Sequence, residues 1–224
     1  MLLPPIAQSA AYHRFAGEST LPNVISNLPF IVVGMYGLWC WRRARWAERS
    51  DRWAWLVVCA AAILIGIGSA YYHNAPGNRP LFWDRLPMTL GFMAVFSAAI
   101  GERIHSKAGL LLLAPFLVLG ILSVEVWRRG ELTGVGDLRF YGLVQFYPMV
   151  ALPLVLLLYP ARYTKTWAMW AMIGCYALAK VFELADPAIY DWTAHVVAGH
   201  PLKHLAGAVA LAFPLHALST RRPV

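Results

Sequence analysis

The sequence predicts an all-α protein, a bundle of seven transmembrane helices that forms a single domain over residues 1–224. Composition is the first observation behind this prediction. Of the 224 residues, 59% are hydrophobic and 13% are charged, whereas soluble domains carry roughly a quarter charged residues. The mean hydropathy of +0.55 agrees. The second observation is segment length, because a helix needs about 20 apolar residues to cross the hydrocarbon core of a bilayer.

Seven apolar segments have this length or nearly so, and short loops join them. Each must be a helix, because lipid offers the backbone no partners for hydrogen bonding. The segments cover residues 26–44, 54–72, 84–101, 108–127, 140–159, 166–184 and 199–219. We therefore expect a multi-pass membrane protein without a soluble appendage.

The net charge of +8 indicates a membrane orientation more than a nucleic-acid partner, because the basic residues cluster at segment ends. Seven spans place the two termini on opposite faces. The face reached after the first segment carries eleven basic residues, against at most eight on the other. The positive-inside rule therefore predicts a cytoplasmic C-terminus and an extracytoplasmic N-terminus. The eleven residues are Arg42, Arg43, Arg45, Arg49, Arg52, Arg103, Lys107, Arg162, Lys165, Arg221 and Arg222.

Polar side chains from three separate segments reach the predicted outer face. The second segment ends there at His73, the third begins there at Asp84, and the seventh begins there with His200 and His204. Ser69 and His73 are four residues apart, so they share one face of a helix, and the same holds for His200 and His204. The order of the spans therefore predicts that these five side chains meet.

This set of residues is typical of a catalytic zinc site. Two histidines four residues apart can hold one metal ion, and a third imidazole would leave one coordination position open. Zinc in such a site lowers the pKa of bound water to about 7. Asp84 could then take or relay the proton, and Ser69 could bind the water or a developing oxyanion. We predict His73, His200 and His204 as metal ligands, with Asp84 and Ser69 as catalytic groups.

Other polar residues favour structural roles. Lys180 and Glu183 are three residues apart, and we expect a structural ion pair on one helix face. Asn23 and Asn27 could line the cavity or cap the first helix. His195 is a possible additional ligand, although a solvated loop is the expected position.

Three stretches of the chain resemble the alkaline ceramidase family, and most closely its bacterial, phytoceramidase-like members. That family belongs to a wider group of seven-span hydrolases that includes the adiponectin and progestin receptors. The resemblance extends from about residue 12 to residue 218. The stretches are SNLPFIVVGMYGL (26–38), GSAYYHNAP with WDRLPMTLGFMAVF (68–96), and ALAKVFELADPAIYD with GHPLKHLAGA (177–208).

The resemblance implies a zinc-dependent hydrolysis of the amide bond of ceramide, which gives a sphingoid base and a fatty acid. It assigns zinc to His73, His200 and His204, and the reaction to Asp84 and Ser69. Such ceramidases also bind calcium through an acidic cluster before the first span. Here that region carries Glu18 as its only acid, whereas calcium takes six to eight oxygen ligands. We therefore do not expect a high-affinity calcium site.

Three alternatives remain open at this point. The same chemistry could act on another lipid amide or on an ester. The protein could instead be a receptor-like, non-catalytic lipid-binding protein, or an ion transporter. A transport pathway usually needs a charged residue near the middle of a span, which we do not find. For a ceramidase we expect a ceramide-like lipid substrate and a membrane-embedded chain, with no nucleic acid and no obligatory protein partner.

Overall fold

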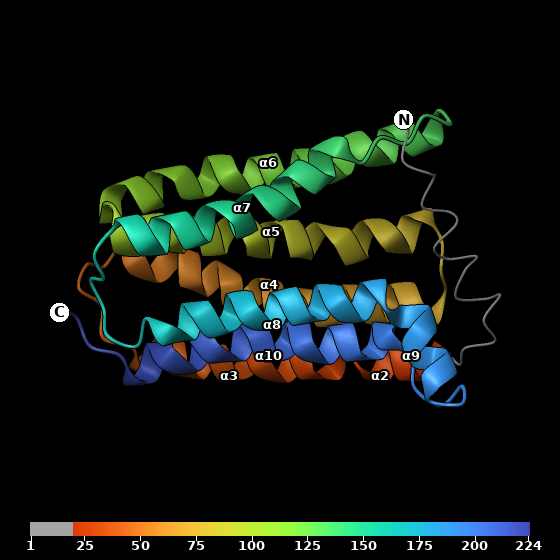
Figure 1. The fold of residues 1–224 in the computed structure, drawn as a ribbon. Coiled ribbons are helices and arrows are strands. Elements are labelled where there is room, and N and C mark those ends of the chain that lie inside the picture. The colour runs from red at the N-terminus through yellow and green to blue at the C-terminus, as the bar shows by residue number, and fades with distance from the viewer. Residues whose placement is uncertain (1–19) are drawn as a thin grey trace.

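The computed structural model describes residues 20–224, and these fold almost entirely into helices that run along one common axis (Figure 1). Within the described residues there is no β-sheet, and one isolated bridge joins Tyr163 to Pro223. The helices are α2 (Thr20–Ile25), α3 (Leu28–Arg43), α4 (Asp51–Asn74), α5 (Asn78–Arg103), α6 (Ser106–Leu132), α7 (Arg139–Leu158), α8 (Trp167–Leu184), α9 (Asp186–Trp192) and α10 (Gly199–Thr220). The predicted all-α class is confirmed.

Six helical segments are long and apolar enough to cross a membrane. They are α2 with α3, then α4, α6, α7, α8 and α10. The remaining predicted span lies in α5, which has 26 residues but includes four polar residues near its start, Asn78, Arg79, Asp84 and Arg85. The structure thus supports a multi-pass membrane protein with six apolar helices. That α5, the third predicted segment, also crosses the membrane stays a prediction.

Apolar side chains on the outside of the bundle agree with a lipid environment. Leu111 is 75% exposed, Leu157 71% and Val150 68%. Extensive apolar exposure is typical of a protein surface that contacts a membrane or another protein. The buried core includes Trp55, Leu215 and Leu218, each at under 2% exposure.

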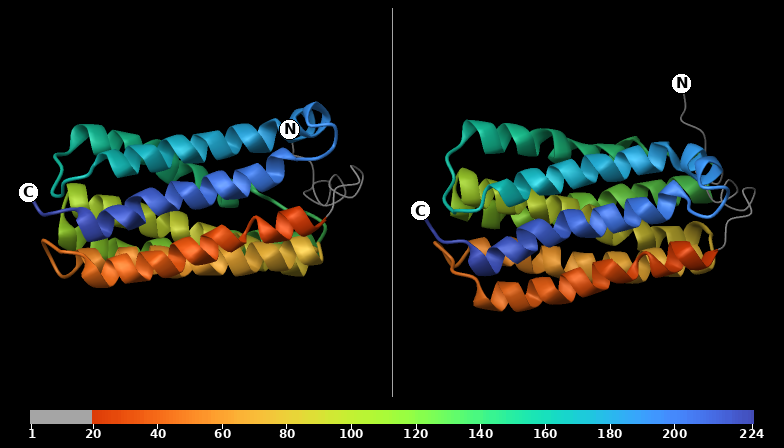
Figure 2. Two further views of the ribbon diagram at one scale, coloured as in Figure 1. Left: turned by 90° about the horizontal axis from the view of Figure 1, so that it is seen from below. Right: turned by 60° about the horizontal axis from the view of Figure 1, so that its bottom comes forward.

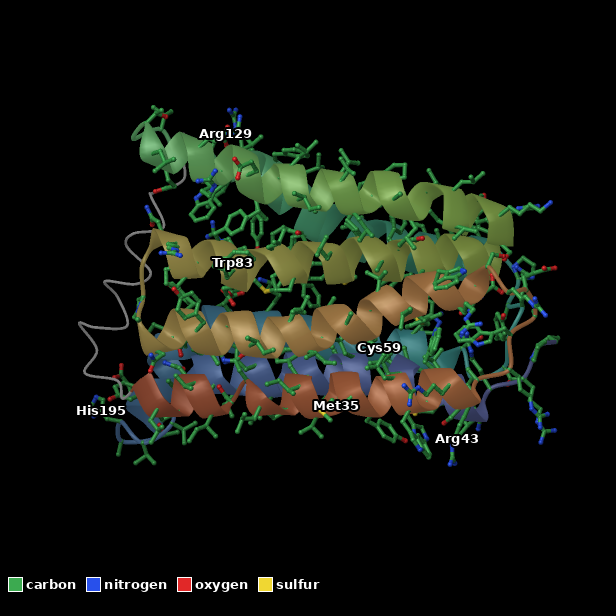
Figure 3. The ribbon with its side chains drawn as sticks, turned by 180° about the vertical axis from the view of Figure 1, so that it is seen from behind. Met35, Arg43, Cys59, Trp83, Arg129 and His195 are labelled. Carbon is green, nitrogen blue, oxygen red and sulfur yellow. The ribbon has the colours of Figure 1, made fainter. Side chains whose placement is uncertain are left out.

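The helices pack in a simple order, and different residues lie at the two ends of the bundle. Helix α4 packs between α3 and α5, α5 also packs against α6 and α7, and α10 packs against α8 and α3. Both views of Figure 2 show α3 and α10 side by side. Figure 3 shows His195 at one end of the bundle and Arg43 at the other. The C-terminus lies at the same end as Arg43, opposite to α9 (Figure 1).

Three of the differences from the sequence prediction concern the polar end of the bundle. Helix α5 begins at Asn78 instead of Asp84, because Pro80 suits the first turn of a helix. The first span is broken at Ser26 and Asn27, where α3 begins with a proline in its first turn. Residues 186–192, predicted as loop, form the short helix α9.

Candidate metal centre

Three histidines meet at the end of the bundle that carries α9. His73 comes from the last turn of α4, and His200 and His204 come from the first turns of α10. One ligand atom from each can be chosen so that all three lie within 4.8 Å of one another. The Nε2 atoms of His73 and His200 are 3.2 Å apart. His73 and His204 are each 6% exposed. The cluster is therefore able to hold a metal ion in a largely buried position.

Ser26 fixes the orientation of one of these rings. Its hydroxyl lies 2.8 Å from Nδ1 of His204, across 178 positions of sequence, and also donates to the backbone carbonyl of Asn23. The break between α2 and α3 places Ser26 at this point. A partner on one ring nitrogen orients a histidine and directs its other nitrogen toward a metal.

Asp186 anchors the start of α10. Its Oδ1 accepts a hydrogen bond from the backbone N–H of His200 at 2.7 Å. The first N–H groups of a helix have no partner within the helix, so such a carboxylate stabilises the helix start. A Cβ at Gly199 would lie 2.3 Å from the carbonyl oxygen of Phe182. Only glycine therefore lets α10 begin this close to α8 and α9.

Asp84 and Ser69 are 9% and 4% exposed, and Ser69 lies one helical turn before His73 on α4. The Asp84 carboxyl lies within electrostatic range of Ser69 and of the charges of Lys203, Arg85 and Glu183. Ser69 is on α4 and Lys203 is on α10, between the paired histidines. Asp84 is thus connected to both helices that carry the histidines.

A close approach of two backbones brings α5 to this place. An ideal Cβ built on Gly68 would lie 2.1 Å from the carbonyl oxygen of Trp83 and 3.4 Å from Cα of Asp84. Figure 3 shows Trp83 on α5, in the half of the bundle that carries His195. Because Gly68 has no side chain, Asp84 can reach the neighbourhood of Ser69 and His73.

The predicted ion pair of Lys180 with Glu183 is present, with Nζ to Oε2 at 2.5 Å. The structure adds Lys203, whose Nζ lies 3.2 Å from Oε1 of Glu183. This bridge joins α8 to α10 next to the histidines. Asn23 and Asn27 are buried at 4% and 0% exposure, and Nδ2 of Asn27 donates to the backbone carbonyl of Asn23.

His195 does not join the centre. It lies after α9, its Nε2 is 3.4 Å from the Asp191 carboxylate, and its side chain is 66% exposed. The solvated position that we expected for it is confirmed. Glu18, on which the calcium expectation rests, lies outside the described residues.

Sequence reasoning missed Ser26 and Asp186. Both fall inside the stretches that carry the family resemblance. Neither spacing nor composition connects them to the histidines, because each contact crosses between separate helices.

Comparison with known proteins gives one match. No curated protein and no solved structure matches the chain. A family model described as ceramidase matches residues 14–184. The match includes Ser69, His73 and Asp84 and ends before His200 and His204, which the fold brings to the same place. Since this family match covers most of the sequence, the chain belongs to the ceramidase family.

Proposed function

We propose that this protein is a membrane-embedded, zinc-dependent amidohydrolase that cleaves ceramide-like lipids into a sphingoid base and a fatty acid. One observation carries the proposal: three imidazoles converge at one end of an apolar helix bundle. The buried hydroxyl of Ser69, one turn before His73 on α4, and the buried carboxyl of Asp84 support it. Membership of the ceramidase family supports the amide bond as the target.

The donor set fits zinc. Three neutral imidazoles are a common ligand set for catalytic zinc, with Zn–N distances of about 2.0–2.1 Å. Ligands at that distance in a tetrahedron are separated by about 3.4 Å, close to the 3.2 Å between Nε2 of His73 and Nε2 of His200. Because Ser26 contacts Nδ1 of His204, this ring would bind the metal through Nε2. Zinc bound there supplies a Lewis acid and lowers the pKa of a coordinated water to about 7.

Asp84 and Ser69 have distinct roles in this proposal. Asp84 takes a proton from the attacking water and later gives it to the nitrogen of the leaving amine, so that the products are a free amine and a carboxylic acid. Ser69 donates a hydrogen bond, either to Asp84 or to the oxygen on which negative charge develops. The bridge from Lys203 to Glu183 keeps α10 fixed against α8 while the substrate binds.

An apolar groove beside Ser26 supports a lipid substrate. It lies between the start of α10 and the α2–α3 region, so a hydrocarbon chain from the bilayer can lie against the protein close to His204. Long apolar chains gain free energy from such burial in proportion to the area covered. The groove is lined by Leu21, Pro22, Ile25, Ser26, Leu28, Pro29, Pro201 and Leu205.

The proposal also includes the arrangement in the membrane. Helix α5 crosses the membrane as the third of seven spans, with Asp84 and Arg85 buried inside the bundle. The histidines and the N-terminus are extracytoplasmic, and the cationic end with the C-terminus is cytoplasmic.

A panel of lipids tests the reaction. The purified protein is incubated with ceramides, other N-acyl amines and phospholipids, and released fatty acid and amine are measured together. We expect equimolar sphingoid base and fatty acid from a ceramide, and no reaction in His200→Ala. Bound zinc per chain is measured in the same samples. Release from an ester alone would exclude the proposed substrate class, and release from no lipid would favour a binding protein.

Asp84→Asn separates the roles of the site residues. It keeps the size of the side chain but removes the proton acceptor, so we expect zinc to be retained and turnover to fall by about 100-fold or more. If this variant kept both zinc and full turnover, Asp84 would have no role in proton transfer. Asp137→Asn is the matched control, because it makes the same change at a carboxylate that pairs with Arg139 outside this group of residues.

A further inference from the structure

A buried arginine at the end opposite to the histidines has an unused hydrogen-bonding edge. Arg221 directly follows α10 and is 6% exposed. Its Nη1 donates to Oε1 of Glu102 at 2.6 Å. Its Nε and Nη2 have no hydrogen-bond partner among the described residues. A buried donor without a partner is costly, so a group that fills this position would be bound favourably.

The unused edge is the one that binds oxyanions. Arg128 uses its Nε and Nη2 to hold both carboxylate oxygens of Glu125, each at 2.7 Å. Arg139 holds Asp137 through the same two nitrogens. Two parallel N–H groups in this fork match the spacing of oxygens in carboxylate and phosphate groups. Arg221 presents the same fork without a carboxylate in front of it.

The cleft around Arg221 is cationic. Its recess of about 430 Å³ includes open solvent, and the space that the centre of a water-sized molecule can occupy is about 30 Å³. Four basic residues line it, namely Arg221, Arg103, Arg162 and Lys165, and Glu102 is the one acid among the lining residues. Asp51 adds a second carboxylate, 3.9 Å from Nη1 of Arg162. The four cations still exceed the two acids, so the cleft favours an anion.

Two of these cations are held in place by backbone contacts. Arg103 donates through Nη1 to the carbonyl oxygen of Tyr159 at 3.0 Å, and Arg162 donates through Nη1 to the carbonyl oxygen of Gly101 at 2.9 Å. They therefore satisfy the last carbonyls at the ends of α7 and α5, and their positions do not depend on a ligand.

Aromatic rings hold the guanidinium of Arg221 as well. Its Cζ lies 4.1 Å from the ring centroid of Tyr163, 5.1 Å from that of Trp46 and 5.6 Å from that of Trp55. Stacking of this kind fixes the plane of the guanidinium group. A fork that is already oriented loses less entropy when it binds an anion.

We propose that this cleft binds a phosphate group at the membrane surface opposite to the candidate metal centre. A phosphate has several acceptor oxygens, so it can receive the fork of Arg221 and a hydrogen bond from Lys165 at the same time. The group is supplied by an anionic phospholipid of the adjacent leaflet or by free phosphate. If the orientation above is right, this is the cytoplasmic leaflet, which is rich in anionic lipids.

Thermal stability in the presence of defined ligands tests the proposal. The full chain in detergent is titrated with phosphatidic acid, with phosphatidylcholine of the same acyl chains, and with inorganic phosphate against chloride at equal ionic strength. We expect a saturable rise of the unfolding midpoint with phosphatidic acid that exceeds the rise with phosphatidylcholine. A rise with inorganic phosphate as well would identify the phosphate group itself as sufficient. A rise with the lipid alone would identify the headgroup at the surface as the source.

Three variants give the site its specificity. Arg221→Lys keeps the charge beside Glu102 but has no fork, so we expect the apparent affinity to fall by about 10- to 100-fold. Lys165→Gln changes an exposed loop residue at the cleft and tests the site with little effect on folding. Arg222→Gln is the matched control, because Arg222 is exposed and does not line the cleft. The proposal would be overturned if all three variants bound with the affinity of the wild type. It would also be overturned if neither phosphatidic acid nor inorganic phosphate gave a saturable shift of the unfolding midpoint.

Discussion

Replacement of Gly68 by alanine tests whether the close approach of α4 and α5 positions Asp84 for the proposed reaction. The added Cβ would lie 2.1 Å from the carbonyl oxygen of Trp83. The obstacle is backbone and cannot rotate away, so α4 and α5 must separate locally by about 1.3 Å, from 2.1 Å to the 3.4 Å at which ordinary contact begins. The separation moves Asp84 away from His73, which lies on α4.

The expected effect on turnover is large and the effect on metal binding is small. A displacement of about 1 Å at a reacting group costs about 100-fold in rate, so we expect kcat for ceramide to fall by that order. The free energy of unfolding should fall by about 1–3 kcal/mol, as for other overpacked sites. The three histidines lie on α4 and α10, not on α5, so zinc per chain should stay at the wild-type level.

Steady-state turnover, zinc content and thermal unfolding are measured on the same preparation. Gly91→Ala is the matched control, because a Cβ there would meet Ala61 at 3.6 Å and Ile65 at 3.8 Å across the same pair of helices. These are ordinary contacts, and we expect turnover close to wild type. Wild-type kcat and stability in Gly68→Ala would refute the claim that this close approach positions Asp84.

The remaining predictions concern the groups that support the histidines. Ser26→Ala removes the contact with Nδ1 of His204, and we expect metal affinity to fall by about 10- to 100-fold in competition with a chelator; an unchanged affinity would show that the hydroxyl does not orient the ring. Asp186→Ala removes the acceptor for the N–H of His200, and should lower the free energy of unfolding by about 1 kcal/mol in thermal melts. Removal of metal with a chelator should lower the unfolding midpoint of the wild type, and added zinc should restore it; a midpoint that ignores both would speak against a bound metal.

Hydropathy predicts most of the fold because the helices must match the bilayer. The predicted segment 199–219 and α10, Gly199–Thr220, differ by one residue, and 166–184 and α8, Trp167–Leu184, also agree within one. Helix α5 agrees less well, since it begins six residues before Asp84. Hydropathy does not detect a helix whose first turns are polar, although Pro80 in its first turn is a start signal.

The candidate site is predictable to the extent that spacing and span order define it. His200 and His204 share a face because they are four residues apart, and His73 is at the same end because the spans alternate in direction. The contact of Ser26 with His204 could not be predicted, because it depends on the relative rotation and register of α3 and α10. That rotation results from packing of whole helix surfaces and has no local signal in the sequence.

The close approach of α4 and α5 has a chemical cause that links three residues. Pro87 lies inside α5 and has no N–H, so the carbonyl four residues earlier, that of Trp83, has no donor at the usual helical position. This is the carbonyl that lies against Gly68. In an apolar environment such an oxygen needs a partner, and the Cα–H group of Gly68 that points where a Cβ would lie can act as a weak donor to it. The proline that frees the Trp83 carbonyl and the glycine that admits it therefore act together. Asp84, the next residue after Trp83, is carried toward Ser69 by the same contact.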